Sequence, residues 1–186
     1  MQVTVAATQM ACGRDRDANI AAAERLVRAA AGRGAQVILI QELFETPYFC
    51  KDHQAAHFEL ATPVGENPAI RRLRAVAAEL GVVLPLSVFE RANNAYFNTL
   101  VMVDADGAIL GQYRKSHIPE GPGYHEKYYF SPGDTGFRVW PTRHGRLGVG
   151  GQVSTKPGHL VADLLRHEIG VLLELEFEID DAHPFG

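Results

Sequence analysis

The start of the chain switches between two apolar patterns. Residues 3–8 are mostly small or β-branched apolar types, which is typical of a strand that is buried on both faces. From Asp17 onwards, apolar side chains recur at helical spacing as far as a glycine-rich stop at Gly32 and Gly34. The next apolar run, VILIQE at 37–42, predicts a second buried strand that ends in polar side chains. A strand, a helix and a strand in this order predict two parallel strands in one sheet.

The middle of the chain continues with an irregular segment, a helix and a strand. Residues 43–66 contain prolines and glycine and predict an irregular connection. The run from Asn67 to Gly81 has helical periodicity, with Asn67 as the N-cap and Gly81 as the stop. Residues 82–90, VVLPLSVFE, predict a third strand.

Two pairs of β-rich runs follow, and each pair predicts a hairpin. Residues 96–107 and 108–115 meet at Asp106-Gly107, which is a strong short-range hairpin signal. Residues 137–142 and 146–150 are separated by a short polar turn and predict a second hairpin. Strands therefore outnumber helices in this half, and the whole pattern predicts a mixed α/β fold.

A long loop separates the two hairpins. RKSHIPEGPGYHEKYYFSPGD at 114–134 contains prolines and glycines that prevent one continuous helix or one central strand. Its aromatic side chains indicate order, because they supply apolar surface that a solvated linker lacks. Ordered loops of this length are usually functional, so the polar side chains of the loop are candidates for a site.

The character of the sequence changes at about residue 150. The segment after it has a loop-like composition, and IGVLLELEFEIDD at 169–181 alternates apolar and acidic residues as an exposed edge strand does. We therefore divide the chain into a domain over residues 1–150 and a divergent tail over residues 151–186.

Composition narrows the class of protein. A length of 186 residues and an apolar content of 46% suit one soluble globular domain with a proper core. The net charge of −4, without a basic stripe, argues against a nucleic-acid partner. No run reaches the roughly 18 apolar residues of a membrane span, and the N-terminus lacks the basic lead of a signal peptide. With two isolated cysteines, Cys12 and Cys50, the sequence predicts a cytoplasmic protein that does not act at a membrane.

Four ionisable side chains are candidates for chemistry, although each also has an ordinary explanation. Glu42 ends an apolar strand, where desolvation raises the pKa of a carboxyl group and makes it a proton acceptor near neutral pH, but polar strand ends are also common. Lys115 follows a strand and could stabilise a developing oxyanion, or be one of many surface lysines. Glu120 and Glu126 lie in the long loop, where either could orient Lys115 or a substrate.

Two other interpretations of the motifs are weaker. His53 and His57 have the spacing of helical metal ligands but lack the glutamate of an HExxH motif, so surface histidines explain them better. GVGG at 148–151 lacks the third glycine of a dinucleotide-binding loop. We therefore expect no metal and no cofactor.

Four segments together resemble the nitrilase, or carbon-nitrogen hydrolase, superfamily. They are TQMAC at 8–12, VILIQELFETPYF at 37–49, RKSHIPEGPGYHEKYYFSPGDTGF at 114–137 and the hairpin that ends in RLGVG at 146–150. The resemblance runs from Met1 to about Gly150, and its motifs are long and specific. It implies a four-layer α-β-β-α sandwich, of which this chain would hold the N-terminal part.

The resemblance also implies a site and a reaction. Members of the superfamily use a glutamate, a lysine and a cysteine, and here Glu42 corresponds to the base and Lys115 to the cation that stabilises the oxyanion. The second glutamate of the superfamily corresponds to Glu126, which leaves Glu120 as the weaker candidate. The nearest branch hydrolyses N-carbamoylputrescine to putrescine, CO2 and ammonia in polyamine biosynthesis. The implied partners are a small amide or N-carbamoyl amine and further copies of the chain in a homo-oligomer.

The nucleophilic cysteine of the superfamily is missing from the sequence. It would follow the strand at 146–150, yet residues 151–154 read Gly-Gln-Val-Ser and no cysteine comes after them. Cys12 and Cys50 fall where members of the superfamily often carry cysteines without using them, so we expect small apolar fillers. Ser154 would need far stronger activation than a thiol. We therefore expect an inactive chain; the alternative is a non-catalytic binding or interface module, or a gene fragment, that keeps the hydrolase scaffold.

Overall fold

The computed structural model describes residues 2–149 of the chain, so the divergent tail and Ser154 lie outside the described residues. The strands are β1 (Val5–Ala7), β2 (Val37–Leu39), β3 (Leu84–Ala92), β4 (Ala95–Val103), β5 (Ile109–Arg114), β6 (Arg138–Thr142) and β7 (Gly145–Val149). The helices are α1 (Arg16–Ala31), α2 (Pro68–Leu80) and α3 (Glu126–Tyr129), and the short 3-10 helices are η1 (Phe49–Lys51), η2 (Ala55–Leu60) and η3 (Val64–Glu66). Each predicted helix and strand up to residue 149 is present.

The two long helices form where the sequence predicts them, and a capping side chain begins each, although only the Asn67 cap was predicted. The Asp15 carboxylate caps α1 by accepting a hydrogen bond from the N–H of Ala18 at 3.0 Å. Asn67 caps α2 in the same way, through the N–H of Ile70 at 2.9 Å. Gly81 ends α2 in the left-handed conformation, with φ of 66°, which glycine adopts without a steric penalty.

The strands of the main sheet lie in the order β1, β2, β3, β4, β5. β1 and β2 are parallel, and a parallel bridge between Val37 and Val83 joins β2 to the start of β3. β4 pairs antiparallel with both β3 and β5, and the hairpin at Asp106-Gly107 is confirmed. β2, β3 and β5 therefore run the same way, so their carboxyl ends lie at one edge of the sheet. We call this the carboxyl edge.

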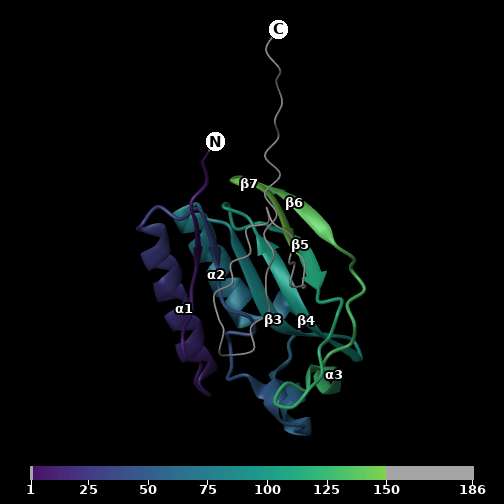
Figure 1. Ribbon diagram of the computed structural model, residues 1–186. Coiled ribbons are helices and arrows are strands. Elements are labelled where there is room, and N and C mark those ends of the chain that lie inside the picture. The colour runs from purple at the N-terminus through teal and green to yellow at the C-terminus, as the bar shows by residue number, and fades with distance from the viewer. Residues whose placement is uncertain (1, 150–186) are drawn as a thin grey trace.

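The elements form three layers (Figure 1). α1 and α2 cover one face of the sheet, and their apolar side chains share a core with Ile38, Leu84 and Leu86. The β6–β7 hairpin covers the other face, where Trp140 and Leu147 pack against the sheet. The described residues thus supply an α-β-β stack, which corresponds to three layers of the predicted four-layer sandwich.

β1 is less buried than its sequence predicts. Val5 is 36% exposed, and Ala7 is also exposed, although we expected burial on both faces. Within residues 2–149, β1 pairs only with β2 and is the outermost strand of the sheet. The apolar side chains on the two faces of the sheet therefore cover β1 incompletely. Burial of an edge strand depends on what packs beside it, and an apolar sequence alone does not report that. Among the described helices, none is long and apolar enough to cross a membrane.

Candidate active site

Glu42, Lys115 and Glu126 come together at the carboxyl edge of the sheet. Nζ of Lys115 lies 2.7 Å from Oε2 of Glu126 and 3.4 Å from Oε1 of Glu42. The three side chains are nearly removed from solvent, with exposed fractions of 8% for Lys115, 10% for Glu42 and 1% for Glu126. The structure therefore places one cation between two carboxylates in a buried setting. It brings together the three residues that the sequence singles out, and their catalytic roles stay predictions.

Glu42 is positioned by the sharp turn that follows β2. Leu43 has φ of 50°, which is uncommon for a residue other than glycine, and its N–H donates to Oγ of Ser87 at 3.2 Å. Nδ2 of Asn98, on β4, makes a short hydrogen bond to Oε1 of Glu42. Backbone conformations of this kind persist where the surrounding contacts hold them. The turn and the Asn98 amide together fix the direction of the Glu42 carboxylate.

A second buried glutamate anchors the same turn. Oε1 of Glu45 accepts hydrogen bonds from Nε and Nη2 of Arg16 at 2.9 and 2.7 Å, and Oε2 accepts one from Nδ2 of Asn67 at 2.9 Å. The Glu45 carbonyl oxygen accepts another from Nδ2 of Asn19 at 2.9 Å. These contacts tie the start of α1 and the cap of α2 to the turn. The position of Glu42 thus depends on both helices of the outer layer.

Lys115 is the first residue after β5, and its backbone is held on two sides. Its N–H donates to the carbonyl oxygen of Asn98 at 2.9 Å. Its carbonyl oxygen accepts from the N–H of Gly133, also at 2.9 Å. Backbone hydrogen bonding therefore continues past the end of β5. It fixes the backbone of Lys115, from which the ammonium group reaches the two carboxylates.

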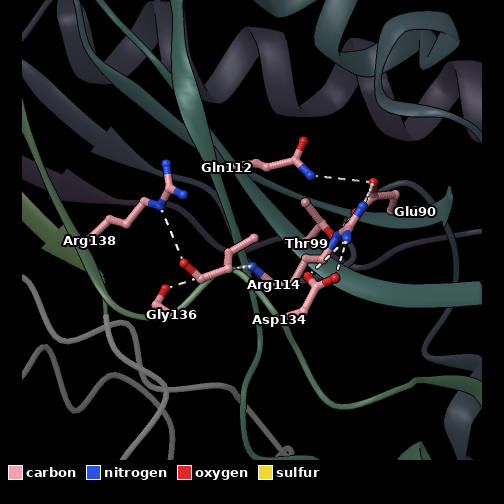
Figure 2. Close-up of polar contacts among 8 residues, drawn as sticks. Glu90, Thr99, Gln112, Arg114, Asp134, Gly136 and Arg138 are labelled. Carbon is pink, nitrogen blue, oxygen red and sulfur yellow. Dashed lines mark hydrogen bonds and ion pairs between the residues drawn. The ribbon is translucent and has the colours of Figure 1, made fainter.

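Arg114 braces the strand that carries Lys115 (Figure 2). Its Nε and Nη2 donate to the two oxygens of Glu90 at 2.8 and 2.6 Å, and its Nη1 donates to Asp134 at 2.9 Å. The N–H of Arg114 donates to Oγ1 of Thr135 at 2.9 Å, and the guanidinium carbon lies 4.0 Å from the centre of the Phe97 ring. Paired, largely buried guanidinium and carboxylate groups of this geometry are rigid. The end of β5 is therefore fixed immediately before the residue that carries the site's cation.

Gly133 allows segment 131–135 to approach β5. A Cβ atom at this position would lie 2.0 Å from the carbonyl oxygen of Arg114, so Gly133→Ala must displace backbone. We expect this substitution to lower the free energy of unfolding by about 1–3 kcal/mol, the range for overpacked positions, as measured by chemical denaturation. Gly65→Ala is the matched control, because a Cβ at Gly65 meets nothing within 4 Å. Equal destabilisation by the two substitutions would contradict the close approach.

Glu126 begins α3, which lies beyond the carboxyl edge of the sheet (Figure 1). Its Oε2 faces Lys115, and its Oε1 accepts a hydrogen bond from the Tyr48 hydroxyl at 2.9 Å. Both oxygens of this buried carboxylate therefore have a donor, which offsets the cost of removing the charge from water.

Aromatic side chains pack around this part of the site. Phe49 contacts the rings of Phe89, Tyr129 and Phe130, with centroid distances of 4.9, 5.0 and 6.1 Å. Tyr129 and Phe130 come from the long loop and are each 3% exposed, which supports the expectation that the loop is ordered. Tyr128 is 41% exposed and does not close the site. The aromatic wall is thus built by η1, β3 and only part of the loop.

Burial and charge act in opposite directions on the site's ionisable groups. Desolvation is the main cause that raises the pKa of Glu42, and the charge of Glu126 adds to it, while Lys115 and Asn98 oppose it. Burial disfavours the Lys115 ammonium, but Glu42 and Glu126 together outweigh burial and raise the pKa of Lys115. Lys115 is therefore a fixed cation at neutral pH, and Glu42 has the raised proton affinity that a general base needs.

The other candidates lie elsewhere or have unsuitable surroundings. Glu120 is exposed and bonds to Nδ1 of His125 at 2.7 Å rather than to Lys115. Cys50 is fully buried, and desolvation, followed by the charge of Glu126, raises the pKa of its thiol far above the ordinary value. Desolvation also raises the pKa of the Cys12 thiol, which donates to the carbonyl oxygen of Phe44 at 3.2 Å. Thiols with raised pKa values are poor nucleophiles near neutral pH.

Sequence reasoning missed two polar partners of the site. Asn98 lies in an apolar run of β4, and an amide inside such a run is the signal that could have marked it. Tyr48 lies in the irregular connection and in the motif at 37–49 that supports the resemblance, but we assigned it no role in the site. Its bond to Glu126 joins residues that are far apart in the chain, and no local pattern predicts such a pairing.

Comparison with known proteins identifies relatives of this chain. A family model described as carbon-nitrogen hydrolase matches residues 4–150. N-carbamoylputrescine amidase of Solanum lycopersicum is 58% identical over 147 residues, which cover 79% of this chain and 49% of that protein. Citrullinase of Francisella tularensis is 45% identical over 148 residues, which cover 80% of this chain and 52% of that protein. The chain therefore spans about half the length of the curated relatives it matches.

Solved structures show the same fold. The crystal structure of a carbon-nitrogen hydrolase from Helicobacter pylori G27 is similar with a TM-score of 0.74 and 34% sequence identity. The match covers 80% of this chain and 51% of that one. The α-β-β stack of residues 2–149 is thus the N-terminal part of the sandwich that the sequence predicts.

Proposed function

The chain belongs to the carbon-nitrogen hydrolase family, and we propose that Glu42, Lys115 and Glu126 form the base and cation part of an amide-hydrolysing site. The observation that carries this proposal is the buried Lys115 ammonium between two carboxylates, 2.7 Å from one and 3.4 Å from the other. A purely structural ion pair needs only one carboxylate for each ammonium. A second buried carboxylate with a raised pKa suits a group that accepts and returns a proton.

The proposed steps follow from the positions of these groups. A nucleophile that transfers its proton to Glu42 attacks the carbonyl carbon, and Lys115 stabilises the negative charge that develops on the carbonyl oxygen. The tetrahedral intermediate then expels ammonia, which takes the proton from Glu42. Water attacks the intermediate bonded to the nucleophile, with Glu42 again as the base, and the nucleophile leaves with the proton from Glu42. A ureido substrate is released as a carbamic acid, which decomposes to CO2 and the amine. Glu126 keeps Lys115 in place throughout and touches no reacting atom.

We propose an N-carbamoyl amine as the substrate. The proteins most similar to this chain include enzymes named for N-carbamoylputrescine and for citrulline, and both compounds carry a terminal ureido group. A ureido carbonyl is less electrophilic than a simple amide, so its hydrolysis depends strongly on oxyanion stabilisation. A fixed, buried cation such as Lys115 can provide this stabilisation of the oxyanion. With N-carbamoylputrescine as substrate, the products would be putrescine, CO2 and ammonia, which belongs to polyamine biosynthesis.

We further propose that the 186-residue chain does not hydrolyse this substrate alone. Its two cysteines are Cys12 and Cys50, and both thiols have raised pKa values. Residues 151–154 contain no thiol. A base and an oxyanion-stabilising cation have nothing to activate without a nucleophile. This same observation favours the second candidate function, a module that binds the amide without turning it over.

A turnover assay separates these possibilities. We expect the purified chain to release no ammonia or putrescine from N-carbamoylputrescine beyond the level of a Lys115→Met variant. We expect turnover to require a thiol where the superfamily has one. Gly151→Ile combined with Gln152→Cys restores this thiol. Gly151→Ile with Gln152→Ser is the matched control. Robust turnover by the unmodified chain that is lost on Ser154→Ala or Cys50→Ala would refute the proposal.

Calorimetric titration with the same compound tests the binding module. Saturable binding to the unmodified chain, without product, would favour that module. The absence of both binding and turnover would refute both candidate functions for this compound.

We also propose a cytoplasmic homo-oligomer without a nucleic-acid partner. Phe137 and Val139, on and next to β6, are 65% and 48% exposed, which is apolar surface of the kind that subunit contacts cover. The net charge of −4 does not favour a phosphate backbone. The two free cysteines suit a reducing compartment.

A further inference from the structure

Three side chains with metal-binding atoms converge outside the candidate active site. They are His53, Glu120 and His125, and one ligand atom from each lies within 4.8 Å of the other two. His53 follows η1, whereas Glu120 and His125 belong to the long loop, so two separate segments contribute. The sequence pairs His53 with His57 by spacing, but the fold pairs it with His125 instead. We call these three residues the HEH cluster.

We propose that the HEH cluster binds a divalent transition-metal ion such as Zn²⁺. Two imidazoles and one carboxylate are a donor set that zinc and its first-row neighbours prefer, whereas magnesium and calcium prefer oxygen donors alone. Three protein ligands would leave at least one coordination position for water or another donor. Nδ1 of His125 and Oε1 of Glu120 lie 2.7 Å apart. These two atoms would separate by about 0.6 Å to hold a tetrahedral ion with ligand distances of about 2.0–2.1 Å.

The contacts between the two imidazoles support a shared ion. The His53 and His125 rings lie edge to face with their centroids 4.3 Å apart. A metal ion takes one nitrogen from each ring, so two rings this close together can share one ion.

The ligands are also held in place by neighbouring groups, as in established metal sites. The second oxygen of Glu120 accepts a hydrogen bond from the N–H of Lys127 at 3.2 Å. The His53 ring stacks on Tyr128, with centroids 4.5 Å apart and an angle of 22° between the planes. The N–H of His125 donates to the carbonyl oxygen of Cys50 at 2.6 Å. Such supporting contacts lower the entropy lost when a metal binds.

A bound ion would connect two segments that flank the candidate active site. His53 lies shortly after η1, and His125 directly precedes Glu126, which contacts Lys115. The ion would therefore cross-link the wall of the site without contacting Lys115 itself. This inference does not depend on hydrolytic activity, because the ligands are not the residues proposed for catalysis.

Metal titration of the full, tag-free chain tests the proposal. After treatment with a chelator, we expect Co²⁺ to give a saturable visible absorption band with one ion per chain, which Zn²⁺ displaces. His53→Gln and His125→Gln should each weaken binding by about 10–100-fold or more. His117→Gln is the matched control, because His117 is an exposed histidine of the same loop outside the HEH cluster, and it should bind as the parent does. Unchanged binding in His53→Gln and His125→Gln would overturn the proposal.

Thermal denaturation provides a second measurement. Zn²⁺ should raise the melting temperature of the parent and of His117→Gln, because a ligand that binds only the folded state stabilises it. It should leave the melting temperature of the His53→Gln/His125→Gln double variant unchanged. Circular dichroism without metal shows whether each variant folds. Since the tail contains His159, His167 and His183, an equal rise in the double variant would assign the binding to other histidines and refute the HEH cluster.

Discussion

Lys115→Met is expected to lower the free energy of unfolding by about 3–5 kcal/mol at pH 7, the range for breaking a buried ion pair from one side. The substitution leaves Glu42 and Glu126 as neighbouring buried carboxylates, with side chains 10% and 1% exposed. Tyr48 and Asn98 would still donate hydrogen bonds to them, but the charge of Lys115 would no longer compensate the two carboxylates. Chemical denaturation of the parent and the variant measures the difference.

The pH dependence of this loss has a definite sign. Without Lys115, which lowers the pKa of Glu42, this carboxyl group would bind a proton more tightly in the folded than in the unfolded state, so the variant should regain stability as the pH falls through the folded pKa of Glu42. In the parent, the raised pKa of Lys115 contributes stability that is present below the unfolded pKa of lysine and is lost as the pH rises through the folded value. The parent should therefore lose this contribution only in alkaline solution.

Two further variants control the interpretation. Lys127→Met removes an exposed lysine of α3 and should change the free energy of unfolding by less than about 0.5 kcal/mol. Adding Glu126→Gln to Lys115→Met removes one of the two carboxylates that Lys115 contacts in the parent and should restore part of the stability. A loss in Lys115→Met that is no larger than in Lys127→Met would show that the ion pair is not buried in solution.

Much of the fold was predictable because its signals are local. The helix cap Asn67 acts within one turn, and the Asp106-Gly107 hairpin joins adjacent strands. The pairing of β3 with β4 was not predicted, although Asn93 at the turn, with φ of 54°, is a residue type that tolerates this conformation. The burial of β1 depends on the elements that pack over it, and the sequence of β1 itself does not predict those elements.

The candidate site shows the same division between local and distant information. Glu42 and Lys115 follow strands that run the same way, but their common edge depends on the pairing of β3 with β4, which the sequence did not predict. The roles assigned to Glu120 and Glu126 could not be separated by composition, and the resemblance to a family selected Glu126. The structure places Glu126, not Glu120, on Lys115. The contacts that Asn98 and Tyr48 make in the site, and the approach of His53 to His125, join segments that are far apart in the chain. The spacing of residues in the sequence does not reveal such contacts.

In a chain that carries the restored thiol, Glu42→Gln is expected to lower kcat by about 10²–10⁴-fold, the range for loss of a positioned general base. The parent for this comparison is the Gly151→Ile/Gln152→Cys variant. The glutamine keeps the size of the side chain and its contact with Asn98, but it cannot accept the proton of the thiol. Glu66→Gln, which changes an exposed glutamate of η3, is the matched control and should leave kcat unchanged.

The alkylation rate of the new thiol measures the same role of Glu42 without turnover. A base that accepts the thiol proton increases the thiolate fraction, so iodoacetamide should modify residue 152 more slowly when Glu42→Gln is added. Peptide mapping distinguishes this thiol from Cys12 and Cys50. Lys115→Met should also slow alkylation, because the proposed site relies on this cation to favour the thiolate. Equal alkylation rates with and without Glu42→Gln would contradict the base role, since the proton must then leave the thiol by another route.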